Sequence, residues 1–252
     1  MNIDLSGRLA IVTGGAGELG RVMVRTLATC GADVVVHYHR SADKAAALVK
    51  EVQAMGRRSM AVAADIGCRK DVNAMRDAVV KALGEVDIVV NNAVTQYEWK
   101  AVLDQAVEDF ESQFRTCVLQ NVLMAQAFVP SMARRGWGRI IATSTECAMQ
   151  CAPVQGAYVS GKRGMDGVLR VLAKEIGHAN VTVNQVAPGW MISDKYRGGG
   201  ECQPGYDEKV PMRHRGEDQD IANAVAFLAS DLAKFITGVY LPVCGGNVMP
   251  AI

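Results

Sequence analysis

The fold of this chain is decided by Thr13-Gly14-Gly15-Ala16-Gly17-Glu18-Leu19-Gly20, a glycine-rich turn that follows an apolar, β-branched run. A turn of this kind, leaving a strand and opening a helix, lets the backbone approach a pyrophosphate. The unpaired N–H groups and the dipole at the helix N-terminus favour negative charge there. We therefore predict a dinucleotide-binding site. The alternative is a tight strand-to-helix turn that binds no ligand.

The rest of the chain alternates short β-branched runs with amphipathic stretches, which is the pattern of βαβ units around a parallel sheet. Strands are predicted at 9–13, 33–38, 59–63, 88–91, 138–143, 181–186 and 239–242. Helices are predicted at 19–30, 42–55, 70–83, 109–135, 157–176 and 219–229. The pattern predicts an α/β fold of the Rossmann type, a doubly wound three-layer sandwich around a parallel sheet of about seven strands.

The length of 252 residues suffices for one large core, so we expect a single domain over residues 1–252. The irregular stretch 190–213 is rich in glycine and follows the sixth predicted strand. A long loop at that place lies beside the ligand crevice of a doubly wound sheet. We interpret it as a substrate lid.

The composition excludes several classes of partner. The 27 basic and 26 acidic residues nearly cancel, so we expect neither nucleic acid nor a membrane surface as partner. The seven cysteines are odd in number and scattered, which is typical of reduced thiols in the cytoplasm. Cys147 and Cys151 lack a second Cys or His pair at suitable spacing, so we expect no metal. No apolar run approaches the ~18 residues that span a bilayer, and no signal peptide is evident.

Tyr158 and Lys162 carry the second motif. Four residues apart on a predicted helix, they share one face, where an ammonium makes a phenol a better proton donor or acceptor. In isolation such a pair is more often structural. Combined with the dinucleotide turn, it indicates hydride chemistry on a carbonyl or an alcohol.

The ordered motifs resemble those of the short-chain dehydrogenase/reductase superfamily, in its 3-oxoacyl reductase-like branch, along nearly the whole chain. They are Thr13-Gly14 with Gly20, Asp65, Asn91-Asn92-Ala93, Tyr158-x-x-x-Lys162, Pro188-Gly189 and Gly245-Gly246. The resemblance implies an NAD(P)-dependent oxidoreductase in which Tyr158 is the general acid in reduction and the base in oxidation. It implies that Lys162 lowers the pKa of Tyr158 and hydrogen-bonds the nicotinamide ribose. Thr145 stands at the position of the family's catalytic serine, with Ser144 as the second candidate.

The resemblance also implies a set of cofactor-binding residues. Asp65 would accept from the adenine amino group, although capping of the following turn is an alternative role. The set is Gly14, Gly17, Glu18, Leu19, Gly20, His37, Arg40, Ser41, Asp65, Ile66, Asn92, Ala93, Tyr158, Lys162, Pro188, Gly189, Met191 and Ser193.

The end of the second predicted strand favours NADP(H) over NAD(H), which remains possible. The segment His37-Tyr38-His39-Arg40-Ser41 has no acid before Asp43 to accept from ribose hydroxyls. The planar guanidinium of Arg40 suits a phosphate, and Ser41 and His37 are further candidate donors. The stretch resembles that of pteridine reductases, but it is too short to carry over their substrate. The alternative is a basic patch at a strand end.

Three residues depart from the family pattern. Glu18 replaces the middle glycine, and a carboxylate near a pyrophosphate is unfavourable unless it points to solvent or pairs with a cation such as Arg21. Cys117 replaces an asparagine that supports a water linked to the lysine, so a proton relay there would be impaired. Val94 replaces a glycine. These departures motivate a catalytically impaired, dinucleotide-binding regulator as an alternative, with an epimerase or dehydratase third.

The substrate is a small carbonyl or alcohol whose identity the residues leave open: a polar ketone, a sugar or polyol, or an acyl keto group. Residues after the fourth and fifth strands and in the lid are predicted to surround it. They are Tyr97, Glu146, Gln155, Trp190 and Tyr196, with Trp99, Met149, Gln150 and Arg197 as further candidates. Most of them have an ordinary surface position as the alternative.

The helices at 109–135 and 157–176 are more apolar than one buried face requires. The crowded residues are Val118, Leu119, Val122, Leu123, Met124, Val168, Leu169, Val171 and Leu172. An extra apolar face implies a partner, and the resembling family commonly assembles through these helices. We expect a homotetramer, with a dimer as the next possibility.

Overall fold

The computed structural model describes residues 2–193 and 205–250. Within them, seven parallel strands form one sheet in the order β3-β2-β1-β4-β5-β6-β7. The strands are β1 (Leu9–Val12), β2 (Asp33–Tyr38), β3 (Ser59–Ala63), β4 (Ile88–Asn91), β5 (Gly138–Thr143), β6 (Val181–Pro188) and β7 (Tyr240–Val243). The predicted doubly wound, Rossmann-type sandwich is confirmed.

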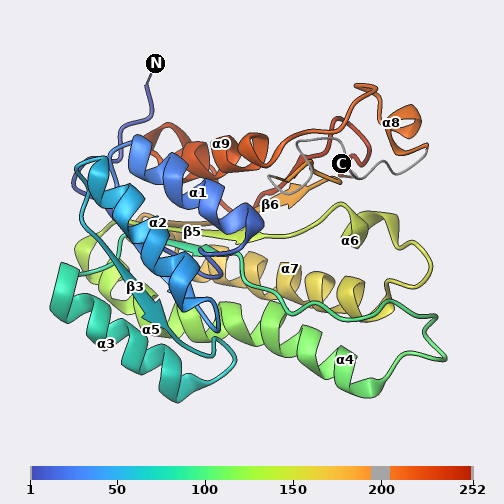
Figure 1. Ribbon diagram of the computed structural model, residues 1–252, viewed down its shortest axis with the longest axis horizontal. Helices are drawn as coiled ribbons and strands as arrows, with labels where there is room; N and C mark the ends of the chain where they lie inside the picture. The colour runs from blue at the N-terminus through green and yellow to red at the C-terminus, as the bar shows by residue number, and fades with distance from the viewer. Residues whose placement is uncertain (1, 194–204, 251–252) are drawn as a thin grey trace.

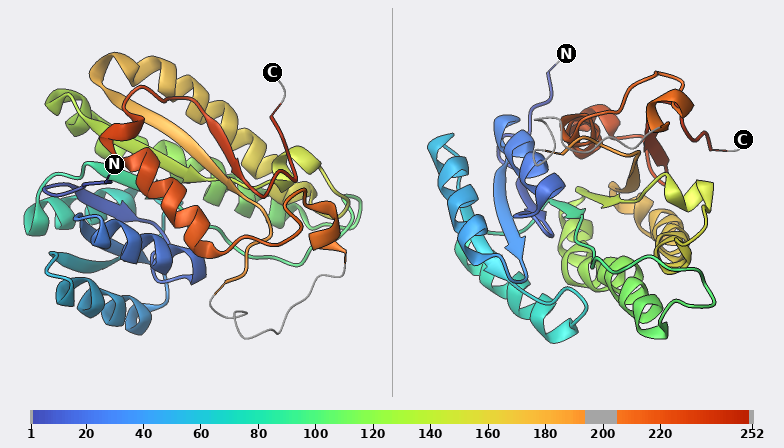
Figure 2. Two further views of the ribbon diagram at one scale, coloured as in Figure 1. Left: turned by 90° about the horizontal axis from the view of Figure 1, so that it is seen from above. Right: turned by 45° about the vertical axis from the view of Figure 1, so that its right-hand side comes forward.

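Helices cover both faces of the sheet (Figure 1). One layer holds α1 (Glu18–Thr29), α2 (Ala42–Ala54) and α9 (Asp218–Ala229). The opposite layer holds α3 (Arg69–Leu83), α4 (Val107–Gln113), α5 (Gln120–Arg135) and α7 (Gly156–Ile176). Figure 2 shows the sheet between these layers from two further sides. The short helices are α6 (Cys147–Gln150) and α8 (Tyr206–Lys209), with 3-10 turns at Gly177–Ala179 and Asp231–Ala233.

Two apolar cores form because successive strand residues point to opposite faces. In β1, Ala10 and Val12 pack toward α1 and α9, while Leu9 and Ile11 pack toward α3 and α5. All four residues are buried, as both-sided coverage of a parallel sheet requires. The sheet is therefore a rigid platform whose strand ends hold the functional loops.

The predicted helix at 109–135 is interrupted, which corrects the sequence-based expectation. Between α4 and α5 the segment Phe114–Leu119 (η1) is a π-helix. Within it, the Cys117 carbonyl accepts a hydrogen bond from Asn121 Nδ2 at 2.7 Å. Apolar periodicity does not register the one extra residue of such a turn, and π-turns often occur at functional sites. In the described part of the chain, no helix is both long and apolar enough to cross a membrane.

Candidate active site

A cleft of about 990 Å³ opens at the carboxyl ends of β1 to β6. It lies at the topological switch point between the adjacent strands β1 and β4, where the strand order reverses. This is the usual position of the ligand in doubly wound sheets. Every residue of the predicted cofactor set lines it, together with Ser144 and Thr145. Sequence reasoning missed other lining residues, which are Tyr38, His39, Thr95, Gln96, Glu108, Glu111, Ser112, Arg115, Thr116, Thr143 and Asp218.

The glycine-rich turn forms one wall of the cleft and requires glycine at two positions. Gly14 has φ +61°, in the left-handed region. A Cβ on Gly20 would lie 2.2 Å from the Gly14 carbonyl oxygen, which excludes any side chain there. Gly17 directly precedes α1, so the helix begins at the cleft. The geometry fits an anion that approaches the backbone N–H groups closely.

Glu18, the departure at the middle glycine, is the first residue of α1. Its Oε2 lies 2.8 Å from Arg21 Nη2, one turn further along the helix. The side chain is 44% exposed. Both conditions under which a carboxylate is tolerated near a pyrophosphate, pairing and exposure to solvent, are therefore met.

Thr13 joins the turn to the end of β4. Its Oγ1 accepts from the backbone N–H groups of Asn92 (2.9 Å) and Ala93 (3.1 Å) and donates to Gln120 Oε1 (2.6 Å). Asn92 Nδ2 in turn donates to the Thr13 carbonyl at 3.1 Å. The roles of Thr13 and Gln120 were not predicted, because their partners are far away in sequence.

His37, at the end of β2, is buried with both ring nitrogens engaged inside the protein. Gly14 N donates to Nδ1 at 3.0 Å, and Nε2 lies 3.1 Å from the Ala64 carbonyl oxygen. Burial lowers the pKa of His37 to about 4. The ring therefore has no N–H left for a phosphate, which corrects its expected donor role.

Arg40 and Ser41 follow His37 and are exposed at the cleft. Ser41 is the residue that precedes α2, and its hydroxyl makes no capping bond to that helix. Further along the cleft, Asp65 Oδ1 accepts from Gly67 N at 2.8 Å. The turn-capping alternative for Asp65 is thus present in the structure, although the residue also lines the cleft.

The first half of α7 carries Tyr158 and Lys162. Lys162 Nζ donates to the Thr143 carbonyl at 2.6 Å and lies 5.6 Å from the centre of the Tyr158 ring. Burial lowers the pKa of Lys162. Burial also raises the pKa of Tyr158 above its ordinary value, against the opposing effect of a hydrogen bond with Thr145. The expected lowering of the Tyr158 pKa by Lys162 is not seen: burial dominates the shift, and Lys162 is not among its causes.

The two hydroxyl candidates are buried at the end of β5. Thr145 Oγ1 accepts from Cys147 N at 3.2 Å and lies beside the Tyr158 phenol, whose pKa it lowers against burial. Ser144 N donates to the Val186 carbonyl at 2.7 Å, which ties this strand end to β6. The side chain of Thr145 thus meets the phenol.

The expected substrate residues brace the site rather than line the cleft. Tyr97 Oη accepts from Tyr158 N at 2.8 Å, at the first turn of α7. Trp99 stacks on the Tyr158 ring at 6.0 Å between centres. Gln155 directly precedes α7, where its amide lies beside the Cys147 thiol. Tyr196 and Arg197 lie outside the described residues.

Glu146 contacts one residue of the expected lid and one residue near the C-terminus. Its Oε1 accepts from Tyr206 Oη at 2.8 Å and its Oε2 accepts from Asn247 Nδ2 at 2.9 Å. Trp190 N donates to the same Tyr206 oxygen at 2.8 Å. Burial raises the pKa of Glu146, and these hydrogen bonds oppose the rise. Glu146 and Trp190 therefore meet at Tyr206, which joins the loop after β5 to the described parts of 190–213, and neither residue lines the cleft.

Cys117 is buried in the π-helical segment. Its Sγ lies 3.8 Å from Gln113 Oε1, and Gln113 Nε2 donates to the Thr95 carbonyl at 2.8 Å. Asn91 Nδ2 donates to Asn121 Oδ1, the same amide that serves the Cys117 carbonyl. Among the described residues, no group of three or more His, Cys, Asp or Glu is placed to hold a metal ion.

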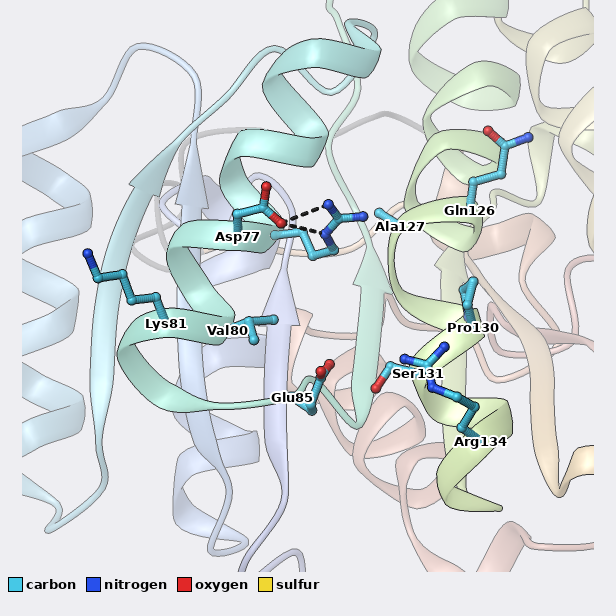
Figure 3. A pocket seen from close by; sticks show the side chains of 10 residues that line it. Asp77, Val80, Lys81, Glu85, Gln126, Ala127, Pro130, Ser131 and Arg134 are labelled. Carbon is cyan, nitrogen blue, oxygen red and sulfur yellow. Dashed lines mark hydrogen bonds and ion pairs between the residues drawn. The ribbon is translucent and has the colours of Figure 1, made fainter.

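A second hollow, of about 440 Å³, lies between α3 and α5. Figure 3 shows Lys81 and Glu85 on the α3 side and Ser131 and Arg134 on α5. Arg76 and Asp77 form an ion pair at 2.7 Å on this surface. The hollow contains none of the predicted site residues, so the chemistry is assigned to the cleft.

A Rossmann-type sheet, a glycine turn at its crevice and a Tyr–Lys pair in the same cleft define a dinucleotide-binding oxidoreductase. A family model described as enoyl-(acyl carrier protein) reductase matches residues 14–247. The chain belongs to the short-chain dehydrogenase/reductase family.

Known relatives cover nearly the whole chain. The 3-oxoacyl-(acyl-carrier-protein) reductase FabG of Staphylococcus epidermidis is 36% identical over 251 residues, which are 95% of this chain and 98% of the relative. The 7alpha-hydroxysteroid dehydrogenase of Escherichia coli K12 is 33% identical, covering 98% of this chain and 96% of the relative. The chain is thus similar to NAD(P)-dependent oxidoreductases.

Two solved structures are similar at a TM-score of 0.89 each. One is a 7α-hydroxysteroid dehydrogenase complexed with NADH and 7-oxo glycochenodeoxycholic acid, at 33% identity and 99% and 97% coverage of the two chains. The other is a blue fluorescent protein from a metagenomic library in complex with NADPH, at 32% identity and 98% and 100% coverage.

Proposed function

We propose that this protein is an NADP(H)-dependent carbonyl reductase or alcohol dehydrogenase of small molecules. One observation carries the proposal: a single cleft is lined both by the glycine turn and by Thr145, Tyr158 and Lys162. The residues that would hold a dinucleotide and those that would move a proton thus face one space. A single domain over residues 1–252, with a substrate lid at about 190–213, remains part of the proposal.

The proton chemistry follows from the three side chains. The bound cofactor supplies or takes up a hydride at carbon, and Tyr158 donates a proton to the carbonyl oxygen in reduction or removes it in oxidation. Thr145 donates a hydrogen bond to the same oxygen and orients it. Lys162, held on the Thr143 carbonyl, offers positive charge as the phenol loses its proton. Burial raises the Tyr158 pKa further above neutral pH, so the resting phenol is protonated and can act as the proton donor in reduction.

The preference for NADPH rests on the end of β2. Arg40 and Ser41 are exposed to the cleft at the start of α2, where a guanidinium, a hydroxyl and a helix N-terminus together suit a phosphate. No carboxylate within the segment 37–41 accepts from ribose hydroxyls. NAD(H) is the second choice, since one similar structure contains NADH and another NADPH.

A catalytically impaired, cofactor-binding regulator is the second candidate, because Cys117 offers only a thiol that reaches Gln113. The family's relay position thus lacks a strong hydrogen-bonding side chain. The pairing of Glu18 with Arg21 removes one argument for this candidate.

We also propose a homotetramer, or next a dimer, in the cytoplasm. Val118, Leu123, Met124 and Leu169 are buried within the subunit, so the apolar surplus is smaller than the sequence suggests. Phe114 on the π-helical segment and Val171 on α7 remain 53% and 56% exposed, and a second copy of the chain is their proposed partner. The free thiols support a reducing compartment.

The test of the proposed function is the loss of reduced-nicotinamide absorbance on a panel of ketones. Tyr158→Phe should lower kcat roughly 10²- to 10⁴-fold and change the Kd for NADPH far less, because the proton donor is lost while the rest of the cofactor-binding set is kept. Thr145→Ser should retain activity that Thr145→Val loses. Tight NADPH binding without turnover of any ketone or alcohol would favour the regulator instead.

A further inference from the structure

We infer that His37 is a positioning residue for the bound dinucleotide. It holds the glycine-rich turn, which would bind the pyrophosphate, at a set distance from the segment after β3, which would bind the adenine. His37 connects the carboxyl ends of three strands, β1, β2 and β3. Gly14 N donates to Nδ1 (3.0 Å), Gly15 N donates to the His37 carbonyl (2.9 Å), and Nε2 meets the Ala64 carbonyl (3.1 Å). The inference rests on the proposed cofactor binding.

The partners of the ring admit one protonation state. Gly14 offers an N–H, so Nδ1 must present its lone pair, and Ala64 offers a carbonyl, so Nε2 must carry the hydrogen. An imidazolium would turn a proton toward the Gly14 N–H and break that bond. The ring is 1% exposed, and its lowered pKa agrees with a neutral side chain. The titratable neighbours that act on the ring are His39 and Asp65.

The position of the ring explains why its contacts matter for a ligand. Gly14 opens the turn in the left-handed region, while Ala64 directly precedes Asp65 and Ile66, which line the cleft at the end of β3. A dinucleotide must reach both segments at once. The ring therefore sets the separation of two surfaces that bind different parts of one molecule. Without the Nδ1 bond, the turn is free to leave its binding conformation, and the apparent affinity falls with the competent fraction.

Two near-isosteric variants separate the two ring contacts. In His37→Asn, the carbonyl oxygen replaces Nδ1 as the acceptor for Gly14, and the contact to Ala64 is lost. In His37→Gln, the amide NH₂ replaces Nε2 as the donor to Ala64, and the acceptor for Gly14 is lost. Each variant removes one buried hydrogen bond, so each is the matched control for the other's effect on folding, which melting temperatures report.

The experiment measures NADPH Kd, steady-state kinetics and hydrogen exchange of the cofactor-free protein. If about a tenth of the His37→Gln molecules keep the competent turn, Kd and the KM for NADPH rise roughly tenfold. We expect kcat at saturating NADPH to be unchanged, and amides 13–20 to exchange faster. His37→Asn should stay within about threefold of wild type on these measures.

Equal effects of the two variants on Kd and on exchange, or no effect of His37→Gln, would overturn the inference. Failure of the wild-type protein to bind NADPH or NADH would instead overturn the proposed function. Exchange in the cofactor-free protein would then still test the coupling of His37 to the turn, so the two failures are distinguishable.

Discussion

At the scale of single residues, the site buries Lys162, and burial disfavours the charged form of its amine. Lys162 has a lowered pKa, and its Nζ is held by the Thr143 carbonyl at 2.6 Å. Beside it, burial keeps the Tyr158 phenol protonated. In the proposed reaction, this neutral phenol gives up its proton and becomes charged, and the nearby Lys162 ammonium would then stabilise it.

Arg40 is the residue on which cofactor choice should depend. Arg40→Ala should raise the Kd for NADPH roughly tenfold or more and leave that for NADH nearly unchanged, because a charge-assisted hydrogen bond to a phosphate is lost. Fluorescence titration with both cofactors measures this. Lys50→Ala, which removes an exposed cation from the same helix α2 outside the cleft, is the control. Equal loss of affinity for both cofactors would contradict the phosphate role.

At the scale of elements, α7 is positioned by residues of a loop that follows β4. Tyr97 accepts the Tyr158 N–H, one of the donors that the first turn of a helix leaves without a partner inside the helix. Trp99 covers the Tyr158 ring. The loop thereby contacts both the backbone and the ring of Tyr158, the proposed proton donor.

Tyr97→Phe should lower stability by about 1 kcal/mol, or roughly 2–4 °C in melting temperature, because the Tyr158 N–H loses its acceptor. Thermal unfolding by circular dichroism measures the change. The affinity for NADPH should remain that of wild type, since Tyr97 does not line the cleft. An unchanged melting temperature would show that water replaces the phenol at no cost.

Glu146 gives a pH dependence to the contact between the loop after β5 and α8. Burial raises its folded pKa above the ordinary value of 4.5, so its contribution to stability is full below that value and is lost as pH rises through the folded pKa. Glu146→Gln removes this dependence. Its melting temperature should therefore improve relative to wild type as pH rises from about 4.5 to 7. A constant difference between the two proteins across this range would contradict the raised pKa.

At the scale of the whole molecule, the sheet brings the ends of six strands to one cleft. The proposed association of several copies of the chain can be tested separately. If copies meet through the π-helical segment and α7, then Phe114→Glu with Val171→Glu should shift the protein from tetramer or dimer to monomer. Sedimentation velocity measures this, with Lys50→Glu as a control of surface charge. A monodisperse wild-type monomer would reject the proposal.

Most of the cleft was predictable because its residues come from short motifs at strand ends. The carboxyl ends of parallel strands converge, so a correct order of strands already places Gly14, Asp65, Asn92 and Pro188 near one another. The residues expected around the substrate were harder to place. Tyr97 and Glu146 have side chains whose partners, Tyr158 and Tyr206, lie about 60 residues away.

The sequence by itself determined the alternating elements, the glycine turn and the Tyr158–Lys162 pair, because hydrophobic periodicity and glycine sterics act over a few residues. Only the tertiary structure decided that His37 holds Gly14 and Ala64, that Glu146 braces α8, and that burial raises the Tyr158 pKa. These properties depend on the polar partners and the loss of solvent that distant segments bring when they pack together.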